Sequence, residues 1–254
     1  ASKSAANELP RDVDPATVEK LASLGYLALS RGSSGPPIDR SLPDPKDRIQ
    51  VYELIRDGTL AAQQEDYDRA VRKLVEAVRR EPGSLVAHFQ LGNVYRVQGS
   101  LDKAEKEFHR TLELRPGYEL ALRRLAEVYL AGRRYEEAEA AYKKVLSQSP
   151  NDFLSHFNLG GLFVIQDRWD EALAAFHKAQ ALHGRDPKIP LIIARILLQT
   201  GDLEAALRAA QQALKLDPNL IEAHQTALEI YRKQGRDPEA QREARILERL
   251  KVKP

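Results

Sequence analysis

The sequence has no cysteine and no methionine, and only one tryptophan among 254 residues. Without cysteine, disulfide bonds, cysteine-ligated zinc, iron–sulfur clusters and thiol nucleophiles are excluded. No run of about 18 apolar residues occurs, so no helix of this chain is expected to insert directly into a membrane. Lysine and arginine number 39 against 37 acidic residues, and this balance argues against nucleic acid as a partner. A chain that starts at Ala1 and lacks methionine is expected to be a processed product or an excised piece.

A 34-residue period runs through the sequence from Val51 onward. Small residues recur on it at one position, which lets two helices approach closely. A large, mostly aromatic position and a Leu-Gly step share the same register. The alanines are Ala70, Ala104, Ala138, Ala172, Ala206 and Ala240; the large residues are Tyr95, Tyr129, Phe163, Leu197 and Tyr231; the Leu-Gly steps are Leu91–Gly92 and Leu159–Gly160. A period of 34 residues is typical of a unit of two antiparallel helices.

This pattern resembles the tetratricopeptide repeat family over six periods without an insertion. The stretches "HFQLGNVYRVQGSLDKAEKEF" at His88–Phe108 and "HFNLGGLFVIQDRWDEALAAF" at His156–Phe176 match that family's pattern. The resemblance implies an all-α fold, a right-handed superhelix (α-solenoid) of six helix-turn-helix repeats with a concave groove. We expect a repeat domain over residues 44–254, with repeats at 51–84, 85–118, 119–152, 153–186, 187–220 and 221–254.

In the family, the first helix of each repeat lines the groove. Carried over to this sequence, the groove positions predict a peptide-binding surface formed by Tyr52, Val86, Phe89, Asn93, Arg96, Leu120, Arg123, Arg124, Glu127, Leu154, Phe157, Asn158, Lys188, Leu191 and Arg195. Its apolar members favour an exposed binding stripe, and the alternative is that several of them tuck between helices. Its arginines suit a ligand that carries carboxylates, and the alternative is pairing with glutamates on neighbouring turns.

Family members that bind chaperone tails hold a C-terminal carboxylate with two lysines, two asparagines and one arginine. The best register here offers Arg123, Glu127, Asn158, Lys188 and Ile192, of which only Asn158 and Lys188 match. Capture of a chaperone tail is therefore not predicted.

No catalytic residue, cofactor site or metal site is predicted from the sequence. It contains no Gly-rich phosphate loop, His-Glu-x-x-His pair or G-x-S-x-G elbow. His88, His156 and His224 share one repeat position, but two whole repeats separate each from the next, so they are not expected to bind one metal ion. Trp169 shares a slot with Tyr67 and Tyr135, which favours packing at the turn between helices.

Residues 1–43 lie outside the period. Asp14–Pro15 and the helical spacing of apolar residues predict a short helix over about residues 14–26, followed by a flexible Ser/Gly/Pro linker. An L-x-x-L-G-Y element at Leu21–Tyr26 and the later "DPKDRI" at Asp44–Ile49 are similar to the junction between a bacterial sulfatase-like catalytic domain and its C-terminal repeats. That resemblance implies an extracytoplasmic location, periplasmic or secreted. The family's nucleophile motif is absent, so no sulfatase chemistry is assigned.

These observations predict a non-catalytic scaffold that binds a peptide or helix of a partner protein in the groove. One alternative is a structural subunit that forms homo-oligomers through the N-terminal segment or an uncapped last repeat, where Leu247 and Leu250 suggest an apolar end face. Another alternative is an accessory domain of an exported sulfatase-like hydrolase.

Overall fold

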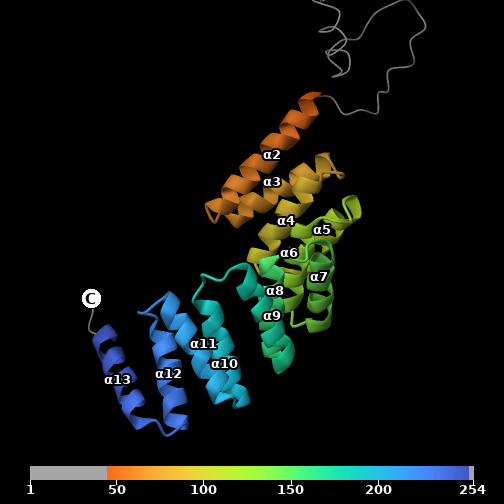
Figure 1. Ribbon diagram of the computed structural model, residues 1–254. Helices are drawn as coiled ribbons and strands as arrows, with labels where there is room; N and C mark the ends of the chain where they lie inside the picture. Colours follow the sequence, from red (N-terminus) through yellow and green to blue (C-terminus); the bar gives the residue numbers. More distant parts are fainter. Residues whose placement is uncertain (1–44, 252–254) are drawn as a thin grey trace, which may run out of the picture. The chain divides into compact units, whose positions relative to one another are not determined.

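The computed structural model describes residues 45–251, which form α-helices joined by short turns and contain no strand (Figure 1). The helices form six consecutive pairs, one pair in each 34-residue period. Their bounds are α2 Pro45–Gln63, α3 Tyr67–Arg80, α4 Leu85–Val97, α5 Leu101–Leu114, α6 Glu119–Ala131, α7 Tyr135–Gln148, α8 Phe153–Ile165, α9 Trp169–Leu182, α10 Lys188–Thr200, α11 Leu203–Leu216, α12 Ile221–Lys233 and α13 Asp237–Lys251. The predicted solenoid of helix-turn-helix repeats is confirmed.

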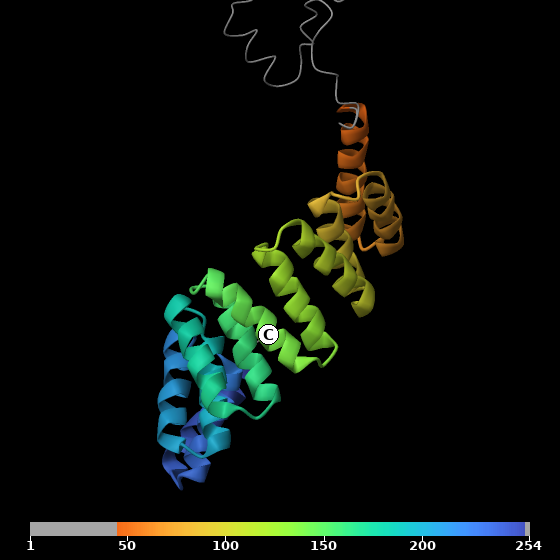
Figure 2. The same ribbon diagram turned by 90° about the vertical axis from the view of Figure 1, so that its right-hand side faces the viewer.

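The two helices of each pair pack on each other, and the second helix of a pair packs on the first helix of the next pair, so the pairs stack in chain order (Figures 1 and 2). First helices also approach one another: α2 contacts α4, α4 contacts α6, and α10 contacts α12. Within residues 45–251, no two second helices pack as closely as these. The first helices therefore line the inner side of the stack, where the family pattern predicts the groove.

Glycines and alanines at fixed positions let the two helices of a pair come close together. All six alanines of the period are buried. A Cβ atom added at Gly92 would lie 2.8 Å from Cε1 of Phe108, and one added at Gly160 would lie 2.8 Å from the ring of Phe176. The ring of the second helix thus occupies the space that a side chain on the first helix would need.

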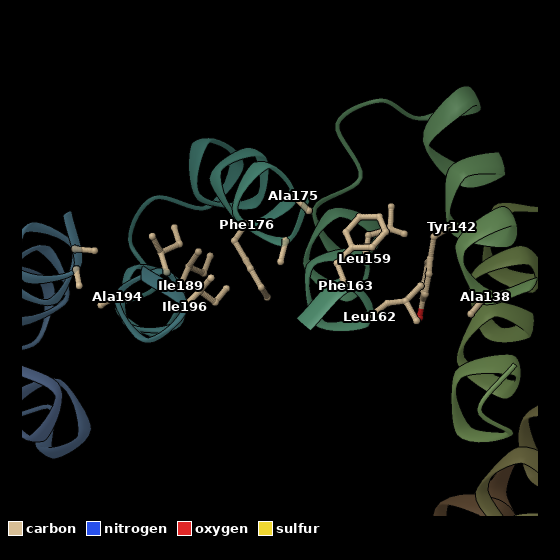
Figure 3. Close-up of a cluster of buried hydrophobic side chains, with 14 of the residues drawn as sticks. Ala138, Tyr142, Leu159, Leu162, Phe163, Ala175, Phe176, Ile189, Ala194 and Ile196 are labelled. Atoms are coloured by element: carbon tan, nitrogen blue, oxygen red, sulfur yellow. The ribbon is translucent and has the colours of Figure 1, made fainter. Parts of the chain in front are cut away.

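A hydrophobic core runs from repeat to repeat without interruption through the middle of the stack. Figure 3 shows part of it: Tyr142 of α7, Leu162 of α8, Phe176 of α9 and Ile189 of α10 lie one after another between the helices. All four side chains are almost fully buried. Because each such side chain contributes about 1.5–3 kcal/mol when buried, neighbouring repeats stabilise one another.

The turns within the pairs have a common geometry. One residue of each turn adopts a positive φ, at the same position of every period: Glu65, Gly99, Arg133, Asp167, Gly201 and Gly235. Several helices are also capped, as where Asp152 accepts a hydrogen bond of 2.8 Å from the backbone N–H of Ser155. Among residues 45–251, no helix is both long and apolar enough to cross a bilayer.

The outer faces of the first and last helices differ in chemistry from the equivalent internal faces. Glu53 is exposed and Asp57 half-buried on α2, whereas the equivalent residues of the next repeat, Ala87 and Leu91, are buried. On α13, Asp237 and Glu248 are exposed. The equivalent residues of the five preceding repeats are partly buried, and all but one of those residues are apolar.

Leu247 itself is buried against the rest of the stack. Leu250, the other residue of the expected end face, is half-buried, so association through the last repeat stays a prediction. The predicted N-terminal helix, the linker and the L-x-x-L-G-Y element lie outside the described residues.

Candidate peptide-binding surface

Four apolar side chains on consecutive first helices are exposed. They occupy the same repeat position, and we call them the apolar row: Tyr52 is 69% exposed, Val86 49%, Leu120 40% and Leu154 47%. In the last two repeats this position holds Lys188 and Glu222, which are also exposed. Large apolar side chains repeated along one side of a stack are unusual on a surface that only meets water.

The two phenylalanines predicted for the surface are partly used in packing. The ring of Phe89 lies 5.9 Å from that of Phe108 and 5.3 Å from that of Tyr118. The ring of Phe157 lies 5.5 Å from that of Phe176. Both side chains are half-buried, as the alternative of tucking between helices predicts.

Leu191 does not lie on an exposed stripe. It is only 6% exposed and packs in a small cluster with Ala213 and Ala223. The expectation that it contributes to the binding surface is wrong, because at this point of the stack the alanines of α11 and α12 leave room for a leucine to turn inward.

Three of the four predicted arginines form ion pairs within the protein. Arg123 donates a hydrogen bond of 3.0 Å to Asp152, the residue that caps α8. Arg124 Nη1 lies 2.9 Å from both oxygens of Glu127, and Arg96 Nη1 lies 3.5 Å from the same carboxylate. Two guanidinium groups therefore share one carboxylate on the inner side of α4 and α6.

The two asparagines of the predicted surface lie on first helices. Asn93 and Asn158 are half-buried on α4 and α8. Asn158 lies near the hydroxyl of Tyr142, but that hydroxyl has no partner with hydrogen-bond geometry in the described residues. Burial raises the pKa of Tyr142 well above its ordinary value.

A pocket of about 270 Å³ opens between α8 and α10, beside the start of α9. We call it the Trp169 pocket; its lining residues are Val164, Trp169, Ile192, Arg195, Ile196 and Gln199. A second pocket of about 310 Å³ shares Arg195 and Gln199 with it and extends to Glu222, Glu229 and Lys233 of α12. Of these residues, only Arg195 is predicted for the surface from the sequence.

The sequence does contain a signal that points to the Trp169 pocket. Ile192 is the one apolar residue at its repeat position, where the other five repeats have Arg56, Gln90, Arg124, Asn158 and Thr226. An apolar residue at a position where the other repeats have polar residues indicates a role that is specific to its own repeat. Trp169 was interpreted only as turn packing because tyrosine occupies the same slot in two other repeats.

Two of the repeating histidines link the two helices of a repeat. His88 is buried, with Nδ1 2.6 Å from Oε2 of Glu107 and Nε2 3.1 Å from the carbonyl oxygen of Pro82. His224 repeats this arrangement with Glu243 and Pro218. Among residues 45–251, no group of three or more His, Cys, Asp or Glu side chains is arranged to hold a metal ion.

Solved structures similar to this chain share the helical repeat architecture. The structure described as "Functional Characterization of Pseudomonas Aeruginosa pilF" is 18% identical with a TM-score of 0.65, over 81% of this chain and 93% of that chain. YrrB, described as "a TPR protein with an unusual peptide-binding site", is 19% identical with a TM-score of 0.59, over 70% and 91%. A structure described as "MamA AMB-1 P212121" is 26% identical with a TM-score of 0.57, over 65% and 98%. A comparison with curated proteins found no match.

Two family models with the description "Tetratricopeptide repeat" match the sequence itself. One matches residues 56–119, 89–153 and 123–188, and the other matches residues 163–219. The matches follow one another along more than half of the chain, over the same helix pairs that the structure contains. The chain therefore belongs to the tetratricopeptide repeat family.

Proposed function

We propose that the inner side of the first helices binds a peptide segment or helix of a partner protein. The observation that supports this proposal is the apolar row, in which four repeats in succession each expose one large apolar side chain at the same position. Proteins of this fold bind protein or peptide partners, and a row of this kind offers an extended ligand one apolar contact per repeat.

Apolar burial supplies most of the attraction in this proposal. Covering the exposed part of one side chain in the row contributes on the order of 1 kcal/mol, so several contacts along the row are needed for useful affinity. The arginines that pair with Asp152 and Glu127 add little net attraction, because their charge is already balanced within the protein. They fix the position of polar groups on the ligand instead.

The other two hypotheses receive less support. Self-assembly through the last repeat is not favoured by α13, which exposes acidic residues on its outer side. Assembly through the N-terminal segment, and the role of an accessory domain in a sulfatase-like hydrolase, depend on residues that lie mostly outside the described part of the chain. Both stay predictions.

A selection from a phage-displayed library of random peptides of about 12 residues tests the proposal. We expect peptides rich in apolar residues to be enriched, and we expect the double variant Leu120→Gln plus Leu154→Gln to bind them at least about tenfold more weakly. The matched control is Leu114→Gln plus Leu182→Gln, which changes two leucines that are each 36% exposed on second helices. The proposal fails if no peptide is enriched, or if the control loses as much binding as the row variant.

A further inference from the structure

The Trp169 pocket lies beside the C-terminal end of α8, the helix whose first turn carries the last member of the apolar row. Leu154, the last member of the row, and Val164, which lines the pocket, are both on α8. Ten residues of helix separate them, which is about 15 Å. A ligand that contacts both Leu154 and the pocket therefore spans about 15 Å along α8, which is about four or five extended residues.

We propose that the Trp169 pocket holds one bulky apolar side chain of the bound segment, and that Arg195 at its mouth pairs with a carboxylate next to that side chain in the ligand. This inference rests on the proposed function and adds a subsite with its own specificity. The ligand class is therefore a peptide in which a leucine-like or aromatic residue stands beside an acidic residue or a C-terminal carboxylate.

The size and lining of the pocket suit a single side chain. Its volume of about 270 Å³ is slightly below the range of about 300–1,000 Å³ that is typical of sites for whole small molecules. Its apolar lining comes from Val164, Trp169, Ile192 and Ile196, and its polar lining from only two side chains. Ile196 is buried, whereas Trp169 and Ile192 are half-buried. With Val164, which is also half-buried, three apolar side chains thus remain partly accessible to a guest.

The repeat fold does not require this lining. Ile192 replaces a polar residue of the other repeats, as in Asn158 and Thr226. Trp169 is larger than any residue at the equivalent position, where the neighbouring repeats have Tyr135 and Leu203. Both departures from the repeat pattern face one pocket, which indicates a role beyond helix packing.

The charge of Arg195 is available to a ligand. Its repeat position carries no other basic residue: the other five repeats have Thr59, Asn93, Glu127, Gly161 and Glu229. Among residues 45–251, no carboxylate forms an ion pair with Arg195, whereas Arg124 is paired with Glu127. Glu229, across the second pocket, lies 3.7 Å from Lys233. An exposed guanidinium beside an apolar pocket suits a carboxylate that arrives with an apolar side chain.

Trp169 gives a direct signal for this pocket, because it is the single tryptophan of the chain. The probe is the peptide acetyl-Gly-Ser-Leu-Asp-Gly-Ser-amide, which contains no fluorescent residue. We expect a saturable change in the tryptophan emission of the full chain when this peptide is added. Replacing leucine by alanine in the probe should weaken binding about tenfold, and replacing aspartate by asparagine about fivefold.

Two protein variants assign the contacts. Arg195→Gln should remove the preference for aspartate over asparagine in the probe while leaving the preference for leucine over alanine. Ile192→Asn, which introduces the residue that Asn158 provides in the preceding repeat, should weaken the binding of all probes that contain leucine. Arg208→Gln is the control, because it removes an exposed charge from α11. Far-ultraviolet circular dichroism verifies that every variant is folded.

The inference is overturned if no probe changes the emission, or if Arg195→Gln leaves the preference for aspartate intact. Its failure is distinguishable from failure of the proposed function by the phage-selected peptides. If those peptides lose affinity for the row variant but bind Ile192→Asn and Arg195→Gln like the unaltered chain, the groove binds a ligand and the pocket is not its subsite.

Discussion

Two adjacent glycines on α8 have opposite surroundings. A Cβ at Gly160 would lie 2.8 Å from the ring of Phe176, whereas a Cβ at Gly161 would meet no other atom within 4 Å. The first glycine is needed for close packing of α8 on α9. The second lies on the inner side of the stack, at the repeat position that Arg195 occupies in the next repeat. The absence of a side chain at Gly161 therefore leaves open space, and the fold does not require glycine at this position.

This contrast predicts opposite effects for one chemical change. Gly160→Ala should lower the free energy of unfolding by about 1–3 kcal/mol, because the methyl group forces the ring of Phe176 to shift. Gly161→Ala should raise it by up to about 1 kcal/mol, because alanine loses less conformational freedom in a helix than glycine. Urea denaturation followed by circular dichroism measures both. Midpoints that move in the same direction would contradict this account.

At the residue scale, the sequence predicts contacts that follow a fixed spacing and misses contacts that depend on residues of other helices. The Leu-Gly step and the alanine position indicated close helix packing because they recur in register. The inward turn of Leu191 depends on alanines of two other helices, and no spacing within its own helix reveals them. The pairing of Arg123 with Asp152 joins α6 to the residue that caps α8, 29 positions further along the chain, so a search on neighbouring turns does not find it.

At the scale of elements, arginines in the turns fasten consecutive helix pairs together. Arg168 stacks 4.3 Å from the centre of the Phe163 ring and donates a hydrogen bond of 2.5 Å to Glu139 of the preceding repeat. It also bonds to Glu171 in its own repeat. Arg134 stacks in the same way on the ring of Tyr129, and it forms an ion pair with Glu105 of the repeat before its own. The large residue of the 34-residue period thus has a second role, as the surface on which the turn arginine stacks.

The pair of Arg168 and Glu139 predicts a dependence of stability on pH. The hydrogen bond from Arg168 holds the pKa of Glu139 below its ordinary value of 4.5. Because the folded pKa is the lower one, the stabilisation is complete above pH 4.5 and is lost as the pH falls through the folded pKa. The free energy of unfolding should therefore decrease in this range.

Glu139→Gln should reduce stability at pH 7 by up to about 1 kcal/mol and should differ little from the unaltered chain at the lowest pH. Glu136→Gln, a change at an exposed residue of the same helix, is the control. Denaturation curves at a series of pH values give the comparison. An equal difference between Glu139→Gln and the unaltered chain at every pH would show that the carboxylate has no role in this dependence.

At the scale of the repeat stack that residues 45–251 form, the polar faces of α2 and α13 that no described repeat covers oppose end-to-end association. A stack of repeats needs ends that tolerate water, because an internal face exposed at an end would bind its equivalent on another molecule. Glu53 and Asp57 stand where the next repeat buries Ala87 and Leu91. Acidic residues at these positions keep the outer face of α2 hydrated.

Glu53→Ala plus Asp57→Leu copies the internal residues onto this face and should promote association. We expect the average mass measured by light scattering to rise with protein concentration more steeply than for the unaltered chain. Glu136→Ala plus Asp170→Leu makes the same change of charge and side-chain type at exposed positions of α7 and α9. Equal behaviour of the two double variants would mean that general loss of charge, and not the end face, governs association.

The apolar row has a further consequence because it stops at Leu154. Identical contacts at every repeat would let a bound segment slip by one repeat at no cost in free energy, leaving several equivalent alignments. Lys188 and Glu222 end this equivalence, since a slipped ligand would place an apolar residue against a charge. Under the proposed function, the change from apolar to charged residues gives the surface a direction, and it favours one alignment of a ligand that is itself apolar at one end and charged at the other.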